Sequence, residues 1–408
     1  MGNNKTILVT GAKGFVGRNL VENLKNIRDV KDPARKKICI DEIFESDVDT
    51  DKEKLKEYCL KADCIYFLAG VNRPKQDTEF MQGNCDSLKE VLDILDQEKK
   101  NASIILSSSI QATLFGRFEG SEYGKSKLAA EKMLFDYSNT HNNKIYVFRF
   151  PGLFGKWCKP NYNSVVATLC DAIANDKEYK ISDKRNEIEL VYIDDAINSM
   201  IDILEEKVDF CCFQGTDEIY SQNGQTEEAK YIYLPKRYKV KLGDIESLLL
   251  DFKAQSKTMY VPHLLDDSFE KKLYATYISY YEPNRISFKL NKKSDSRGSF
   301  TELFKTNANG QFSLNVCKPH MTKGIHWHNL KCEIFIVISG EGIIRERKLG
   351  CTDVIEISVN GNEPEAVYML PGYTHSIENQ SDDEDLIFLV WANEVFDEQK
   401  PDTFREKV

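Results

Sequence analysis

Residues Thr6-Ile-Leu-Val-Thr-Gly11-Ala-Lys-Gly14-Phe-Val-Gly17 decide the fold of the first part of this 408-residue chain. A short run of β-branched and apolar residues leads into three glycines spaced three apart, and a helical pattern follows. Glycines at such a turn let backbone N–H groups and the positive end of a helix approach a pyrophosphate. The stretch therefore predicts a dinucleotide site with contacts from Gly11, Gly14, Phe15, Val16 and Gly17.

Strand-like and helix-like patterns alternate after this turn. Helical patterns that could cross over a sheet occupy residues 52–61, 87–99 and 123–141, and apolar runs that read as strands occupy 38–40, 64–68, 104–106 and 145–150. This order predicts an α/β domain over residues 1–284, built on a Rossmann-type, doubly wound parallel sheet. A polar stretch at 213–228 reads as an exposed loop, and 241–281 reads as helical.

The pattern changes to glycine-punctuated, alternating segments from Ser287 onward. Such alternation predicts an all-β domain, which we place at residues 285–408. Two domains also agree with the chain length, because one hydrophobic core rarely organises so many residues.

Composition limits the partners of the chain. Its 65 acidic and 55 basic residues give a net charge of −10, which argues against nucleic acids and anionic membranes. The sequence shows no export signal, and no apolar run approaches the roughly 18 residues of a membrane span, so we expect a cytoplasmic protein. The 11 scattered cysteines read as reduced thiols.

Tyr123-Gly-Lys-Ser-Lys127 places a phenol and an ammonium one helical turn apart. The ammonium can lower the phenol pKa from about 10, so that the tyrosine exchanges a proton with a carbonyl oxygen. Together with the glycine turn, these residues resemble the extended short-chain dehydrogenase/reductase family. The resemblance implies that Ser109, with Ser108 as the alternative, orients the carbonyl of a substrate. It also implies that NAD(P)H contacts Leu68, Ala69, Gly70, Tyr123 and Lys127.

Asp41 ends the second apparent strand, where an acid would accept hydrogen bonds from the adenosine ribose and repel a 2′-phosphate. This favours NADH, although Asp41 could equally be a surface turn residue and Arg18 could bind a 2′-phosphate. The strand end Arg149 to Gly155 resembles that of nucleotide-sugar enzymes, with Gly152 where asparagine is usual. The polar residues predicted to bind a nucleotide-sugar, or else to form a solvated loop, are Asn72, Arg73, Lys156, Lys159, Asn161 and Asn163.

A second site is indicated by His326-x-His328-x4-Glu333 and by Pro371-Gly372-x2-His375. Alternate residues of a strand share a face, so the first two histidines point together. Glu333 and His375 complete a cage of three nitrogens and one carboxylate, which suits Zn²⁺ better than iron or manganese where no redox chemistry is apparent. The motifs resemble those of metal-binding cupins. A barrel without metal is the alternative. If the site is catalytic, neither His320 nor Tyr373 can be assigned as its general base.

Both sites together resemble the bifunctional capsular-polysaccharide enzymes that join a reductase to a C-terminal cupin. Further segments that carry this resemblance are Ser107 to Thr113, Phe154 to Asn163 and Pro401-Asp-Thr403. It implies that a UDP-2-acetamido-2,6-dideoxy-4-hexulose is epimerised at C3 by the cupin. The reductase would then reduce C4 to UDP-2-acetamido-2,6-dideoxy-L-talose, on the route to UDP-N-acetyl-L-fucosamine. Because cupin barrels commonly pair, we expect a homodimer.

Two other functions stay open. The chain could be a nucleotide-sugar 4,6-dehydratase or 4-epimerase with a regulatory cupin, but dehydratases place threonine and an Asp-Glu pair where this chain has Ser109-Ile-Gln111. It could also be a non-catalytic dinucleotide sensor. A sensor, however, has no need of the proton donor Tyr123 and its activator Lys127.

Overall fold

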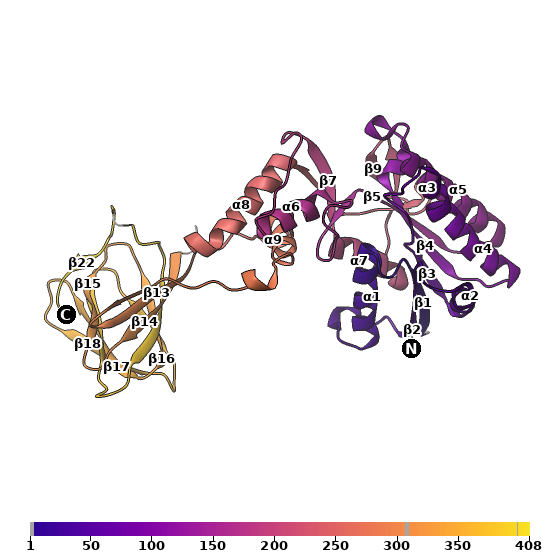
Figure 1. Ribbon diagram of the computed structural model, residues 1–408. Coiled ribbons are helices and arrows are strands. Elements are labelled where there is room, and N and C mark those ends of the chain that lie inside the picture. Colours follow the sequence, from indigo (N-terminus) through magenta and orange to yellow (C-terminus); the bar gives the residue numbers. More distant parts are fainter. Residues whose placement is uncertain (1–3, 307–309, 398) are drawn as a thin grey trace. The chain divides into compact units, whose positions relative to one another are not determined.

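A computed structural model describes residues 4–306, 310–397 and 399–408 (Figure 1). The chain divides into two compact units, and each has its own hydrophobic core. The first unit comprises Met1–Leu249 and Asp267–Tyr281, and the second comprises Leu250–Asp266 and Glu282–Val408. The predicted domains, 1–284 and 285–408, differ from these units over residues 250–266 and 282–284. The predicted domain boundary remains a proposal.

The first unit is built on a twisted sheet whose first five strands are parallel, in the order β2-β1-β3-β4-β5. These strands are β1 (Lys5–Thr10), β2 (Ile40–Ser46), β3 (Cys64–Phe67), β4 (Ser103–Ser109) and β5 (Ile145–Phe150). Helices cover both faces, because apolar side chains of the strands point alternately to each side (Figure 1). One face packs against α1 (Phe15–Arg28) and α7 (Ile193–Asp202), and the other against α2 (Lys52–Lys61), α4 (Ser87–Gln97) and α5 (Glu122–His141). The predicted Rossmann-type fold is confirmed.

Smaller elements complete this unit. The main sheet continues through β10 (Tyr231–Ile232), β8 (Phe210–Gln214) and β9 (Asp217–Tyr220), and a three-stranded sheet contains β11 (Tyr238–Lys241), β7 (Glu187–Tyr192) and β6 (Gly152–Phe154). The other α-helices are α3 (Thr78–Met81), which leads into a π-helical turn at Gln82–Asp86, α6 (Val165–Ala174) and α9 (Phe269–Ile278). The helix α8 (Leu242–Thr258) begins in this unit, and its residues from Leu250 onward belong to the second.

One prediction about this unit is wrong and another is wrong in part. The expected loop at 213–228 begins as a hairpin, in which Cys211 pairs with Tyr220 and Gln214 with Asp217, and residues 221–228 form the loop. The expected strand at 38–40 lies almost wholly before β2, which starts at Ile40. Because β2 is an edge strand, it keeps polar residues on its exposed positions and gives no continuous apolar signal.

From residue 292 onward, the described residues of the second unit form two antiparallel sheets. One contains β12 (Lys292–Asp295), β13 (Gly298–Thr306), β14 (Gly310–Cys317), β21 (Leu386–Ala392), β16 (Glu333–Ser339) and β19 (Ala366–Met369). The other contains β18 (Val354–Asn360), β17 (Glu341–Lys348), β20 (Tyr373–Asn379), β15 (Thr322–Trp327) and β22 (Phe404–Arg405). Phe335 and Phe388 of the first sheet share a buried cluster with Ile344 and Ile377 of the second. The predicted all-β architecture is confirmed.

Among the described residues, no helix combines the length and apolar character that crossing a membrane would need.

Candidate active site and metal centre

The glycine turn connects β1 to α1, and two of its glycines leave no room for a side chain. Gly11 has a left-handed φ of +63°, and a Cβ there would lie 2.8 Å from the backbone nitrogen of Ala69. A Cβ on Gly17 would lie 2.1 Å from the carbonyl oxygen of Gly11. Gly14 caps α1, whose first turn holds no acidic side chain. The turn therefore leaves a helix N-terminus ready for a pyrophosphate, as a dinucleotide requires.

A cavity of about 1120 Å³ opens beside this turn, at the carboxyl ends of the parallel strands. This is where doubly wound sheets bind their ligands. The predicted residues that line it are Gly11, Gly14, Phe15, Val16, Gly17, Leu68, Ala69, Gly70, Asn72, Arg73, Ser109, Tyr123, Lys127, Lys159 and Asn163.

Asp41 does not belong to this cavity. It lies near the amino end of β2, whereas the glycine turn follows the carboxyl end of the parallel strand β1. The acid at the carboxyl end is Asp47, which lines the cavity and accepts a hydrogen bond of 2.7 Å from the backbone N–H of Lys13. The prediction of Asp41 is wrong in its position, because the second strand was expected too early in the sequence.

Two of the predicted substrate-binding residues also lie outside the cavity lining. Lys156 donates a hydrogen bond of 2.5 Å to Asp194, and the backbone N–H of Asn161 donates to Thr168. The cations of Arg73 and Lys159, by contrast, lie 5.9 and 5.5 Å from the ring centre of Tyr162, which also lines the cavity. Positive charge thus gathers at one part of the cavity.

Tyr123 and Lys127 meet the serines at the end of β4. The Lys127 ammonium donates to the carbonyl of Ser107 at 3.0 Å and lies 5.8 Å from the ring centre of Tyr123. Burial lowers the pKa of Lys127 to about 8, and the charge of Glu131 partly opposes this. Burial raises the pKa of Tyr123, although a hydrogen bond with Ser109 lowers it in part. At neutral pH the site therefore holds a protonated phenol beside a cation.

Ser108 has a different role from Ser109. Its hydroxyl donates a hydrogen bond of 2.5 Å to the buried carboxylate of Glu131, one helical turn beyond Lys127 on α5. Of these two serines, Ser109 is the one with a hydrogen bond to Tyr123, so the alternative assignment of Ser108 as the carbonyl-orienting hydroxyl loses support.

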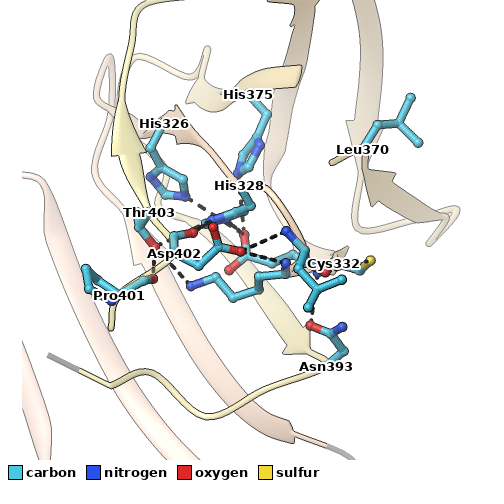
Figure 2. A network of polar contacts seen from close by, with 12 residues as sticks. His326, His328, Cys332, Leu370, His375, Asn393, Pro401, Asp402 and Thr403 are labelled. Atoms are coloured by element: carbon cyan, nitrogen blue, oxygen red, sulfur yellow. Dashed lines mark hydrogen bonds and ion pairs between the residues drawn. The ribbon is translucent and has the colours of Figure 1, made fainter. Parts of the chain in front are cut away.

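Four potential metal ligands converge in the second unit (Figure 2). His326 of β15 is paired in register with His375 of β20, while His328 follows β15 and Glu333 begins β16. One ligand atom of each residue lies within 4.8 Å of the others. The Glu333 carboxylate is 3.4 Å from His375 Nε2 and 3.5 Å from His328 Nε2. The predicted ligands are thus brought together as expected.

The histidine nitrogens of this cage fit a divalent cation. Nε2 of His328 and both ring nitrogens of His375 are buried without a hydrogen-bond partner. Such groups cost free energy unless something binds them. His328 Nδ1 donates to the carbonyl of Asp402 at 2.5 Å, which leaves the Nε2 lone pair free to face the cage (Figure 2). His320, in contrast, is exposed and paired with Asp382.

Comparison with known proteins covers both units. Residues 7–210 match the NAD dependent epimerase/dehydratase family, and residues 293–404 match the polysaccharide biosynthesis C-terminal domain. A UDP-2-acetamido-2,6-beta-L-arabino-hexul-4-ose reductase of Pseudomonas aeruginosa is 33% identical over 398 residues, which cover 98% of this chain and 97% of that relative. The chain also resembles a crystal structure of the capsular polysaccharide assembling protein CapF from Staphylococcus aureus. The TM-score is 0.84 at 42% identity, over 98% of this chain and 100% of that one.

The chain belongs to the CapF family. A second CapF structure, with the inhibitor 3-isopropenyl-tropolone, gives a TM-score of 0.80 at 39% identity over 99% of this chain and 100% of that one. The predicted resemblance and fold class are confirmed, and the CapF-family chain is an NAD-dependent enzyme of the epimerase/reductase type. The dinucleotide sensor without activity is therefore set aside.

Behind the cavity, the CapF-family chain holds a buried ion pair that sequence reasoning missed. Arg149 and Glu131 are 2.6 Å apart and are 7% and 1% exposed. Replacing Arg149 by methionine should lower the free energy of unfolding by about 3–5 kcal/mol, because Glu131 would stay buried without its partner. Urea unfolding monitored by circular dichroism would measure the loss. The control is Arg185→Met at a 91% exposed side chain, and a loss as small as in that variant would contradict the prediction.

Acid should destabilise the metal-free cage of the CapF-family chain. Burial, with the charge of His375 second, lowers the pKa of His326 from 6.5 to about 4. Burial raises the pKa of Glu333, but the neighbouring His328 and His375 outweigh it, so the net shift is downward. Between about pH 6.5 and pH 4 the unfolded chain binds a proton that folded His326 does not, so the free energy of unfolding falls as the pH falls.

Urea unfolding of the metal-free chain at several pH values, monitored by tryptophan fluorescence, would measure this effect. His326→Gln should show a weaker pH dependence than the unaltered chain. Equal slopes in the two proteins would show that His326 does not contribute.

Proposed function

We propose that the chain carries out two consecutive reactions on one UDP-sugar, an epimerisation at C3 in the second unit and a reduction at C4 in the first. The substrate would be a UDP-2-acetamido-2,6-dideoxy-4-hexulose. The observation that carries this proposal is that each unit holds its own group of reactive side chains. Ser109, Tyr123 and Lys127 border one cavity, and the cage of three histidines and Glu333 lies in the other unit.

The reductase site suits protonation of a carbonyl oxygen. NAD(P)H, held at the glycine turn, supplies a hydride when it is bound. Tyr123 would donate its phenolic proton to the oxygen that gains negative charge, with Ser109 orienting that oxygen. Lys127 would stabilise the tyrosinate that forms. The cations of Arg73 and Lys159 would bind the pyrophosphate of the UDP-sugar, and Asp47 would accept hydrogen bonds from the ribose of NADH.

The cage suits an epimerisation next to the ketone. A divalent ion, for which we propose Zn²⁺, supplies Lewis acidity when it is bound by His326, His328, Glu333 and His375. A base of the chain must then remove the proton at C3 and allow its return from the other face. Of the two candidate bases, Tyr373 lies two positions before His375 on β20 and so shares its strand face, whereas His320 is 63% exposed.

The finer assignments rest on the family and are part of the proposal. The product would be UDP-2-acetamido-2,6-dideoxy-L-talose, used to make UDP-N-acetyl-L-fucosamine for capsule or O-antigen. We also propose that the enzyme is a homodimer and acts in the cytoplasm, where its nicotinamide cofactor is available. A 4,6-dehydratase or 4-epimerase would use the same cofactor without net oxidation, which separates it from the function proposed here.

Nicotinamide absorbance during incubation with a UDP-2-acetamido-4-keto-6-deoxyhexose in D₂O, followed by mass analysis of the product, tests the proposal. Cofactor oxidation together with deuterium at carbon is the expected result. Absence of oxidation would favour a dehydratase or 4-epimerase. Oxidation without deuterium would leave the cage without a catalytic role.

A further inference from the structure

The segment of residues 401–407, which we call the C-terminal strap, runs along the metal ligands. Within it, β22 pairs with β15, so that Arg405 lies opposite His326 and Phe404 opposite Trp327. The Trp327 and Phe404 rings stack with their centres 4.8 Å apart. The strap therefore forms the edge of the sheet that carries His326 and His375.

Asp402 binds the loop between His328 and Glu333 (Figure 2). Its Oδ2 accepts hydrogen bonds from the backbone N–H groups of Leu330 at 2.8 Å and Lys331 at 2.9 Å. Its Oδ1 accepts from the backbone and the side chain of Asn329, at 3.0 and 3.1 Å. One carboxylate thus satisfies three consecutive backbone donors and fixes the loop that separates two metal ligands.

The backbone of the strap contacts the histidines themselves or their neighbours. The carbonyl of Asp402 accepts the hydrogen bond from His328 Nδ1 and so selects the tautomer whose Nε2 can bind a cation. Glu406 donates its N–H to the carbonyl of Ile325 at 3.3 Å, and its carbonyl accepts from the Thr374 hydroxyl at 2.6 Å. Ile325 and Thr374 directly precede His326 and His375 in the sequence. Three of the four ligands are therefore held through the strap.

We propose that Asp402 is a positioning residue of the metal centre, which fixes the orientation of His328 and the loop before Glu333 and thereby sets the metal affinity. The inference rests on the proposed metal centre. It adds to that centre a contact between His328 and Asp402, which lies 74 residues later in the sequence. Outer partners that orient a ligating histidine typically change metal affinity about 10- to 100-fold when they are removed. We expect an effect within this range from Asp402, although it is not one of the four potential ligands.

The experiment measures the affinity of the full-length, metal-depleted chain for Zn²⁺ by competition with a chromophoric chelator. D402N keeps the backbone carbonyl that accepts from His328 Nδ1, but it loses a carboxylate oxygen that accepts from the loop N–H groups. It should bind Zn²⁺ about 10-fold more weakly than the unaltered chain, at the lower end of that range. The matched control D382N removes the charge of an aspartate that is 94% exposed, and it should leave the affinity unchanged. D402E, which keeps the charge, should restore part of the affinity.

A second control separates positioning from stability. Val337 is buried in the barrel core, so V337A should lower the melting temperature without touching the strap. If D402N and V337A lose Zn²⁺ affinity alike, or if D402N binds as tightly as the unaltered chain, the inference about Asp402 is wrong. If the unaltered chain itself binds no Zn²⁺, the proposed metal centre fails instead.

Discussion

Replacing Tyr123 by phenylalanine should slow the oxidation of NAD(P)H by about 10²- to 10⁴-fold, the usual contribution of a positioned acid. Burial raises the pKa of this phenol, so it is protonated before the reaction, and the cation of Lys127 is close enough to stabilise its anion. Phenylalanine keeps the ring and its packing against Phe80, but it has no proton to donate. Nicotinamide absorbance with the 4-keto substrate measures the effect.

The same variant should still exchange the proton next to the ketone with solvent, because the cage is in the other unit. Tyr137→Phe provides a matched control, since it removes a hydroxyl from the same helix, α5, outside the cavity lining. A Tyr123→Phe enzyme that oxidises cofactor as fast as the control would remove Tyr123 from the reaction.

Replacing both His326 and His328 by alanine should abolish exchange at C3. The variant lacks two of the four potential metal ligands. Loss of an outer partner can lower metal affinity by about 100-fold, and we expect the loss of two ligands to lower the Zn²⁺ affinity further. Binding of NADH, measured by its fluorescence, should stay unchanged because the glycine turn belongs to the first unit.

His263→Ala is the control for this variant, since that side chain is exposed and lies outside the cage. Deuterium incorporation from D₂O and zinc content of the purified protein would be compared in both variants. If the double variant keeps exchange at the rate of the control, the metal cage is not the epimerisation site. If it also loses NADH binding, the proposed division of labour between the units fails.

Local periodicity was enough to predict most of the fold. The glycine turn has a strict steric requirement, because Gly17 packs against the carbonyl of Gly11, and its spacing therefore marks the dinucleotide turn directly. The four side chains of the cage lie together as expected for a similar reason. His326 and His328 are close in sequence, and strand alternation fixes their common direction.

Residues that depend on pairing between distant segments were harder to predict. Asp47 was missed because an edge strand with polar positions hides where it ends, and Asp41 was taken in its place. Lys156 looked free in the sequence, but it pairs with Asp194, 38 residues later. The Asp402 carboxylate accepts hydrogen bonds from the backbone N–H groups of residues 329–331. No local sequence pattern predicts such contacts.

The order of the segments along the chain also determines which of the two sites can form first during synthesis on the ribosome. Every segment of the first unit has been synthesised by Tyr281, before the first histidine of the cage at residue 326 exists. When Glu333 has been added, His375 and the pairing strand β22 are still missing. Since domains generally fold as units during synthesis, starting from the N-terminus, the nascent chain gains its dinucleotide pocket first. A complete set of metal donors comes last.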